Sequence, residues 1–532
     1  MKVFEELNRP FRTENFEDNT IFFDFGKHAF AVFEVEIFSS GVQDITLAVG
    51  EASINGRVNR SPGGSLVYQE EKITVPYGTS YLKMQMFHAG YNDGTLKLEH
   101  EAAPFRYAEI RGNVTVRRAW QRAFFGRFDD DASDFKSSSS DLDKIWEFCK
   151  YTMKATTPFG VFIDGNRERQ AYEGDAYINQ LGYFVCTSDR KIAGNTIDRL
   201  LEYPTWPTEW RLSMIPIVHD YLLYTGDLTS VRKWYEPLQE NLLTEGINDI
   251  GLLNPALLKS ARKSLGIGNV IIPIRDIVDW PVCERDGYEM GEVNLVPNCW
   301  YYTALCRMAD IALSLKKSDA AAEFQKMAVR SRTAIRSYML KNGLFVDNPQ
   351  SEHTSLHSCI YPVLWGISEK NENKKILQVL QSKGMACSVF TAQSLLDCCF
   401  ENGLSDYGLD LITSHGKRSW NNMIDCGATI AMESWDESFK PNLDWSHPWG
   451  GAPGNIIIRH IAGIRPLEAG FKKFSVSPNP GWLQYFNART PSPYGNISLE
   501  MPQVGKYVLS VPENTCAVYQ GREYGKGMHV LS

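Results

Sequence analysis

The sequence lacks the features that mark several large classes of protein. Nowhere in its 532 residues does an apolar run approach the length of about 18 residues that a membrane-spanning helix needs. A glycine-rich phosphate loop, a dinucleotide fingerprint and a nucleophile elbow are all missing. These absences argue against a transmembrane protein, against the common nucleotide-binding folds and against a serine hydrolase of the elbow type.

Cysteine pairs and an apolar leader are also missing. The chain has 11 cysteines, an odd number, and no C-x-x-C pair. Many of them stand among apolar neighbours, which is typical of reduced, buried thiols. Residues 1–10 carry acids where a signal peptide would need an apolar run. We therefore expect a cytoplasmic protein, or a periplasmic one if a leader has been removed.

Positive charge is not in excess. The formal net charge is -8, whereas nucleic acids and anionic membranes select basic surfaces. We expect neither as a partner, and a neutral small molecule fits better. His353 and His357 have the spacing of zinc ligands but lack the glutamate of a metalloprotease, which favours a structural role. We expect no metal and no cofactor, and a homodimer is one option that stays open.

The pattern of the chain changes twice. Short β-rich runs, such as residues 29–37 and 44–49, alternate in places with a period near two. A polar, serine-rich segment follows, after which helical spacing dominates until short strands return beyond Pro466. The length favours two to four structural units. The predicted units are an N-terminal β-sandwich (1–125), a linker (126–140), a large helical domain (141–465) and a C-terminal β-sandwich domain (466–532).

Two clusters of carboxylates and aromatic side chains lie about half a chain apart. The first reads Asp-Gly-Asn-Arg-Glu-Arg-Gln-Ala-Tyr-Glu-Gly-Asp (164–175) and the second Ala-Thr-Ile-Ala-Met-Glu-Ser-Trp-Asp (428–436). Cleavage of a glycosidic bond needs a protonated acid at the leaving oxygen and a second carboxylate on the other side of the sugar ring. Aromatic faces can hold the sugar. The two clusters together therefore predict a glycosidase.

The first cluster resembles the acidic signature of the bacterial α-L-rhamnosidases of glycoside hydrolase family 78. The second cluster, with the stretch Trp-Ser-His-Pro-Trp-Gly-Gly-Ala-Pro (445–453), resembles the second signature of that family, and segments 204–210 and 276–280 also match its pattern. The resemblance covers nearly the whole chain. It implies a multidomain α plus β protein in which a central (α/α)6 barrel is flanked by an N-terminal β-sandwich and a small C-terminal β domain.

The resemblance also implies roles for individual residues. Glu168 would be the general acid and Glu433 the general base of an inverting, exo-acting enzyme that removes terminal α-L-rhamnose from oligosaccharides or glycosides. The sequence departs from the commonest form of the first signature, because the segment before Arg-Glu-Arg is shorter and Tyr172 stands where Trp is frequent. The residues expected to bind the sugar are Asp164, Arg167, Tyr172, Asp175, Trp206, Trp210, Asp279, Trp280, Trp435 and His447.

The chemistry of rhamnose sets further expectations. Its C5 methyl group needs an apolar surface, and its hydroxyls need hydrogen-bond partners. Glu168 has to stay protonated near neutral pH, which requires burial or a neighbouring anion. Arg167 and Arg169 act against this, so we expect at least one of them to point away from Glu168 or to be neutralised by Asp164, Glu173 or Asp175. Inversion predicts that the carboxyls of Glu168 and Glu433 lie roughly 6.5–9.5 Å apart.

Several alternatives stay open at this point. The same architecture hosts glycosidases for other sugars, and a chain that keeps the fold could bind sugar without cleaving it. Asp175 stands near the start of a helix and could serve as its cap. The N-terminal β domain could bind carbohydrate or brace the helical domain. Because residues 104–110 read as a buried strand, we favour the brace.

Overall fold

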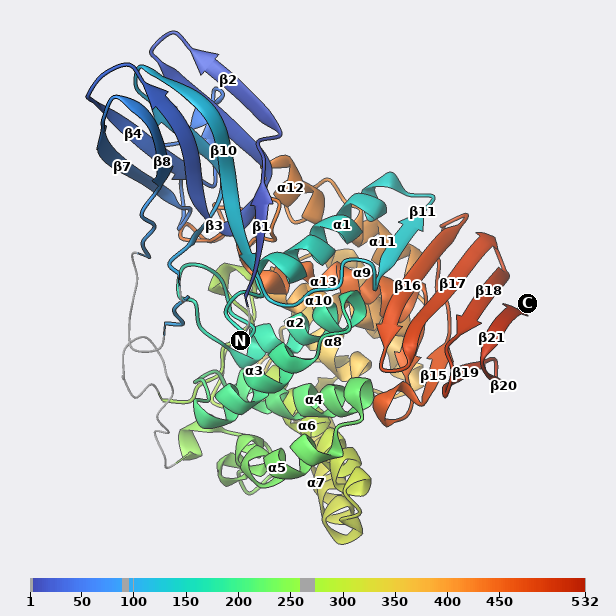
Figure 1. The fold of residues 1–532 in the computed structure, drawn as a ribbon. Coiled ribbons are helices and arrows are strands. Elements are labelled where there is room, and N and C mark those ends of the chain that lie inside the picture. The colour runs from blue at the N-terminus through green and yellow to red at the C-terminus, as the bar shows by residue number, and fades with distance from the viewer. Residues whose placement is uncertain (1–2, 89–94, 99, 259–272, 532) are drawn as a thin grey trace.

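The computed structural model describes residues 3–88, 95–98, 100–258 and 273–531, which form three parts (Figure 1). An N-terminal sheet leads into a large group of helices, and two further sheets follow in the C-terminal part. Figure 1 shows the N-terminal sheet and the C-terminal sheets against different sides of the helical part.

The N-terminal part is built on one eight-stranded sheet. Its longest strand, β3 (Thr20–Ser39), pairs with β2 and β9 near its start and with β8 and β10 near its end. Residues 29–35 of β3 are buried, as expected for a strand that is covered on both faces. The other strands are β1 (Phe4–Asn8), β2 (Arg12–Phe16), β4 (Gln43–Gly50), β7 (Tyr68–Val75), β8 (Gly78–Lys83), β9 (Ala103–Arg111) and β10 (Val114–Phe125), with a small separate hairpin of β5 (Ser53–Ile54) and β6 (Arg57–Val58).

The helices of the central part fall into two groups by burial. One group is buried on nearly all sides, which is typical of helices at the centre of a large core. Its members are α2 (Glu173–Cys186), α4 (Thr208–Thr225), α6 (Leu295–Ser314), α8 (Leu356–Leu364), α10 (Val389–Glu401) and α13 (Ala452–Ile456). The other helices bury one stripe or a shorter patch. They are α1 (Ser140–Ala155), α3 (Lys191–Glu202), α5 (Leu228–Gln239), α7 (Ser318–Met339), α9 (Lys370–Lys383), α11 (Ser405–Ile412) and α12 (Trp420–Asp425).

The buried helices contact one another in a fixed order. Along the chain each one packs against the next, from α2 through α4, α6, α8 and α10 to α13, and α13 packs against α2 again. The segments that enter α2, α4, α6 and α13 contain both carboxylate clusters and the two intervening tryptophan-rich segments. Because these helices are neighbours, segments far apart in the sequence meet at their N-terminal ends.

Two sheets form the C-terminal part. One contains β14 (Ile464–Pro466), β15 (Lys473–Val476), β19 (Cys516–Tyr519) and β20 (Arg522–Tyr524). The other contains β11 (Asp134–Ser137), β16 (Phe486–Ser492), β17 (Gly495–Gln503), β18 (Lys506–Val511) and β21 (Gly527–Leu531). Strand β11 corrects the prediction of a linker at 126–140. The segment is polar as a whole, but the buried ring of Phe135 gives it a place in the C-terminal sheet.

The structure bears on two further expectations. All 11 cysteines are free thiols, and seven of them are fully buried. In the part of the chain that the structure describes, each helix is too short or too polar to cross a membrane.

The side chain of Phe135 joins the predicted linker to the rest of the molecule. Its ring is fully buried and lies 6.2 Å from the ring of Phe486 and 6.1 Å from the ring of Trp146. We predict that Phe135→Ala lowers the free energy of unfolding by about 3–5 kcal/mol, since the substitution leaves a cavity in a packed core. Chemical denaturation measures this loss. Lys136→Ala, on the exposed face of the same strand, is the control and is expected to stay within about 0.5 kcal/mol of wild type.

Candidate active site

A cavity of about 370 Å³ opens at the N-terminal ends of the buried helices. It brings together the two carboxylate clusters and the tryptophans between them. Of the residues expected to form a sugar site, those that line it are Asp164, Arg167, Glu168, Tyr172, Asp175, Trp206, Trp210, Trp280, Glu433 and His447.

Arg167 links the two carboxylates at the centre of the cavity. Its Nη1 donates to Glu433 Oε2 (2.6 Å) and its Nη2 donates to Glu433 Oε1 (2.8 Å), which is a bidentate pair. The same Nη2 donates to Glu168 Oε1 at 3.2 Å. Lys440 Nζ lies 3.2 Å from Glu433 Oε1. Glu433 therefore faces two cations, and a single nitrogen, Arg167 Nη2, contacts both carboxylates. The nearest oxygens of Glu168 and Glu433 thus lie closer together than the roughly 6.5–9.5 Å predicted from inversion.

Glu168 and Glu433 differ in how deeply they lie. The side chain of Glu433 is 2% exposed, whereas that of Glu168 is 21% exposed. The hydroxyl of Tyr172 donates a hydrogen bond to Glu168 Oε2 (2.5 Å). Glu168 thus lies nearer the opening of the cavity, and Glu433 lies deeper.

Arg169 points away from Glu168, which confirms the expectation that at least one of the two arginines does so. Its guanidinium is fully buried, donates to Glu101 Oε1 (2.7 Å) and Ala102 O (2.7 Å), and also binds Asn166 Oδ1. Its backbone has φ of 52°, in the left-handed region that a residue with a Cβ rarely adopts. This reversal of the chain sends the side chains of Arg167 and Arg169 to different partners.

His447 is held between two acids. Its Nε2 lies 3.0 Å from Asp175 Oδ1, and its Nδ1 lies 3.5 Å from Asp444 Oδ1. Burial opposes the charged ring, but the two carboxylates outweigh it and hold the pKa of His447 well above its usual value. Helix α2 begins at Glu173, so Asp175 lies in its first turn with its side chain directed to His447. The alternative of Asp175 as the helix cap is therefore wrong.

Asp164 lies at the base of the cavity, in the loop before α2. Its backbone N–H donates to Gln170 O (2.7 Å), and its Oδ1 accepts from Gln170 N (2.9 Å). Burial, reinforced by Glu168, raises the pKa of Asp164 well above its usual range. The protonated form can donate a hydrogen bond to a sugar hydroxyl, whereas an ionised carboxylate can only accept one.

Two glycines of the first cluster allow this close packing. A Cβ at Gly165 would lie 2.3 Å from Asp444 Oδ2, and a Cβ at Gly174 would lie 2.5 Å from the ring of Trp210. The two glycines in the motif thus let the chain approach Asp444, which follows the second cluster, and the ring of Trp210.

The structure corrects two of the expected sugar contacts, because Trp435 and Asp279 lie outside the lining of the cavity. Trp435 is fully buried and packs edge-on against Trp420. Its Nε1 donates a hydrogen bond to Cys387 O (2.8 Å). Asp279 is also fully buried, and its carboxylate accepts from Ser388 N at 3.0 Å. Both side chains support the loops of the cavity without lining it. In the sequence, a supporting aromatic or acidic residue cannot be told from one that lines the cavity.

Five lining residues were not predicted: Arg275, Ile277, Lys440, Asn442 and Trp449. Trp449 belongs to the same stretch as His447 and packs on it with ring centroids 4.3 Å apart, so its motif offered a signal. Its Nε1 donates to Glu433 O at 3.0 Å. Ile277 lies within segment 276–280, so its motif also offered a signal, whereas nothing in the local sequence marks Lys440.

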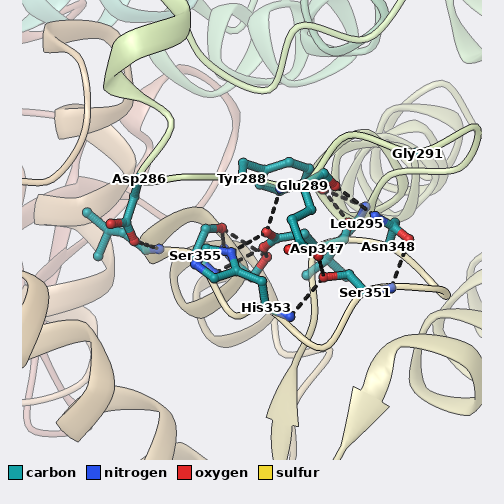
Figure 2. A network of polar contacts seen from close by, with 12 residues as sticks. Asp286, Tyr288, Glu289, Gly291, Leu295, Asp347, Asn348, Ser351, His353 and Ser355 are labelled. Atoms are coloured by element: carbon teal, nitrogen blue, oxygen red, sulfur yellow. Dashed lines mark hydrogen bonds and ion pairs between the residues drawn. The ribbon is translucent and has the colours of Figure 1, made fainter.

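The two histidines with zinc-like spacing bind separate carboxylates. His353 Nδ1 lies 2.6 Å from Asp347 Oδ2, in the polar network that joins residues 286–291 to residues 347–355 (Figure 2). His357 Nε2 lies 2.7 Å from Asp279 Oδ2. Within the described residues, no group of three histidine, cysteine or acidic side chains could hold a metal ion. Each histidine of the pair thus has its own carboxylate partner.

The central helices, with paired carboxylates and aromatic walls at one end, define a domain of the glycosidase type. Residues 130–461 match the family model described as the bacterial alpha-L-rhamnosidase 6 hairpin glycosidase domain, and residues 463–520 match the bacterial alpha-L-rhamnosidase C-terminal domain. The chain belongs to the bacterial α-L-rhamnosidase family, as its two signatures indicated.

Individual relatives are distant in sequence. An alpha-L-rhamnosidase of Formosa agariphila is 23% identical over 448 residues, which are 78% of this chain and 47% of that protein. The structure of an alpha-L-rhamnosidase from Aspergillus terreus has a TM-score of 0.79 at 15% identity, over 99% of this chain and 63% of that one. An alpha-L-rhamnosidase from Streptomyces avermitilis, complexed with L-rhamnose, has a TM-score of 0.78 at 15% identity, over 99% and 53%. These structures share the fold, and the chain spans about half the length of the curated relative from Formosa agariphila.

The raised pKa of His447 predicts how stability depends on pH. The folded-state pKa lies above the unfolded value of about 6.5, so the stabilisation by the charged ring is fully present below that value and is lost as the pH rises through the folded pKa. We predict that His447→Gln costs about 3–5 kcal/mol at pH 6, because it leaves buried carboxylates without their cation. The cost should shrink toward pH 9. Urea unfolding of both proteins at several pH values measures it, and a cost that grows with pH would contradict the assignment.

Proposed function

We propose that the chain is an inverting, exo-acting α-L-rhamnosidase that hydrolyses terminal α-L-rhamnosyl residues of oligosaccharides or glycosides. The observation that carries this proposal is that Glu168 and Glu433 meet at one guanidinium, inside a cavity with aromatic walls. Membership of the rhamnosidase family supports the choice of sugar.

The different depths of the two carboxylates support their roles. An acid has to reach the oxygen that joins the sugar to the rest of the substrate, and that oxygen lies toward the opening when a terminal sugar is bound. Glu168 is the more exposed of the two, so we assign it as the general acid. Glu433 lies deeper, where it would activate a water molecule on the opposite face of the ring. In the free protein Arg167 holds Glu433 in place for that step.

The walls of the cavity suit a 6-deoxy sugar. Ile277, Trp206 and Trp280 offer apolar surface to a methyl group, while Asp164, Asp175 and His447 can bond to ring hydroxyls. A volume of about 370 Å³ is near the lower end for ligand pockets. This size favours one terminal sugar over an extended chain, in agreement with exo action.

The order of helix contacts supports the architecture implied by the family resemblance. Six buried helices contact one another in sequence order and return to the first, and the more exposed helices alternate with them along the chain. We infer an (α/α)6 barrel with the cavity at the N-terminal ends of its inner helices.

The experiment that tests the function is hydrolysis of p-nitrophenyl α-L-rhamnoside. Wild type is expected to release p-nitrophenol, and Glu168→Gln and Glu433→Gln are each expected to lower kcat roughly 10²–10⁴-fold, since each removes an acid or a base from the reaction. The control is Glu468→Gln, which changes an exposed carboxylate in the C-terminal part and is expected to keep wild-type kcat. Full activity in either catalytic variant would remove that residue from the mechanism, and an inactive wild type would count against rhamnose as the sugar.

A further inference from the structure

We propose that the N-terminal sheet domain is a positioning part of the active site, because it fixes both loops that carry the two carboxylates. The first loop is residues 164–172, with Glu168, and the second loop is residues 433–447, with Glu433. This inference rests on the proposed function, and it gives the sheet domain a task beyond bracing the helices.

A short turn of the sheet domain, residues 63–65, docks on the second loop. Ser65 N donates to Leu443 O (2.8 Å), and Ser65 Oγ donates to Asn442 O (2.9 Å). The Asn442 carbonyl also accepts from Arg167 Nη1 at 2.8 Å. A carbonyl oxygen has two lone pairs, so one is used by the sheet domain and the other by the guanidinium that bridges the carboxylates. The docking turn and Arg167 therefore share the Asn442 carbonyl as a hydrogen-bond acceptor, and this carbonyl links the turn to the centre of the site.

The close approach of the turn depends on Gly64. Its φ is 64°, and a Cβ there would lie 2.5 Å from Leu443 O, a backbone atom. Leu443 is fully buried, so the second loop has little free space into which it could yield. Any side chain at position 64 has to push the turn and the second loop apart.

A second group of residues from the sheet domain, His88, Leu96, Glu101 and Ala102, holds the first loop. His88 Nε2 donates to Asn166 O (2.6 Å), and Leu96 N donates to Arg169 O (2.9 Å). The buried guanidinium of Arg169 binds Glu101 and the carbonyl of Ala102. These contacts lie on both sides of Glu168 in the sequence. They explain how the first loop keeps Arg169 turned away while Arg167 faces the cavity.

The geometry thus ties the loops of both carboxylates to the N-terminal sheet domain, outside the helical domain. Acid and base catalysis needs the two groups on opposite faces of the sugar, and a misplacement of about 1 Å can cost about a hundredfold in rate. The sheet domain sets this placement through Gly64 and Ser65 on one side and through its contacts with Arg169 on the other. None of these residues lines the cavity, so they are positioning residues.

The test compares Gly64→Ala with Gly78→Ala in the full chain. Gly78 belongs to the same sheet, also has a positive φ (106°), and an added Cβ would meet nothing within 4 Å among the described residues. Gly64→Ala is expected to lower kcat on p-nitrophenyl α-L-rhamnoside roughly ten- to a hundredfold, with a smaller change in KM, because the apolar walls come from other loops. Gly78→Ala should keep kcat within about twofold of wild type. Like Gly64→Ala it places a Cβ at a positive φ, but its Cβ does not meet the second loop. Asparagine tolerates a positive φ but, like alanine, adds a Cβ. Gly64→Asn should therefore lower kcat as Gly64→Ala does.

Hydrogen exchange separates this inference from the proposed function. Amides of residues 433–447 should exchange faster in Gly64→Ala than in wild type and should be unchanged in Gly78→Ala, whether or not the chain cleaves a rhamnoside. If wild type is inactive on the rhamnoside, the proposed function fails and exchange alone decides the inference. Wild-type exchange together with wild-type kcat in Gly64→Ala would overturn it, and so would an equal loss in both alanine variants.

Discussion

The active site depends on the contact between Arg167 and the carboxylates of Glu433 and Glu168. A buried carboxylate is costly unless a cation or hydrogen-bond donors accompany it, and Glu433 is almost completely buried. The bidentate contact supplies those donors, and its strength keeps the pKa of Arg167 above the usual value even though burial works in the opposite direction. Because Arg167 also bonds to Asn442 O, the same side chain joins the two loops of the site.

The other buried charged groups of the site also lie next to groups of opposite charge. His447 holds its proton between two acids, and Lys440 stands at Glu433 although burial lowers its pKa. The carboxylates of this region thus have different surroundings. Asp164 is driven toward its neutral form, whereas the pKa of Asp444 is lowered by His447 and Arg167 despite burial. Asp164 lines the cavity and in its neutral form can donate a hydrogen bond, whereas Asp444 lies outside the lining, beside His447.

The lining residues that the sequence predicted are mostly those that stand close together in a motif. Glu168 and Tyr172 share one loop, and His447 lies in the second signature, so their types and spacing were informative. The same evidence could not separate Trp435 from Trp449, since both are tryptophans of the second region and only packing sends one of them behind the loop. Strand β11 was missed because its partner, β16, lies about 350 residues later. The contact of Gly64 with the second loop is equally invisible, because it joins segments that are nearly 400 residues apart.

In the proposed reaction Glu168 and Glu433 act on opposite faces of one rhamnosyl ring. The most direct measurement is proton NMR of the sugar that wild type releases from an α-L-rhamnoside, recorded before the anomers equilibrate. Attack of water from the face of Glu433 predicts that β-L-rhamnose appears first. Early release of the α anomer would mean that a carboxylate attacks the sugar directly, which would contradict the roles assigned here.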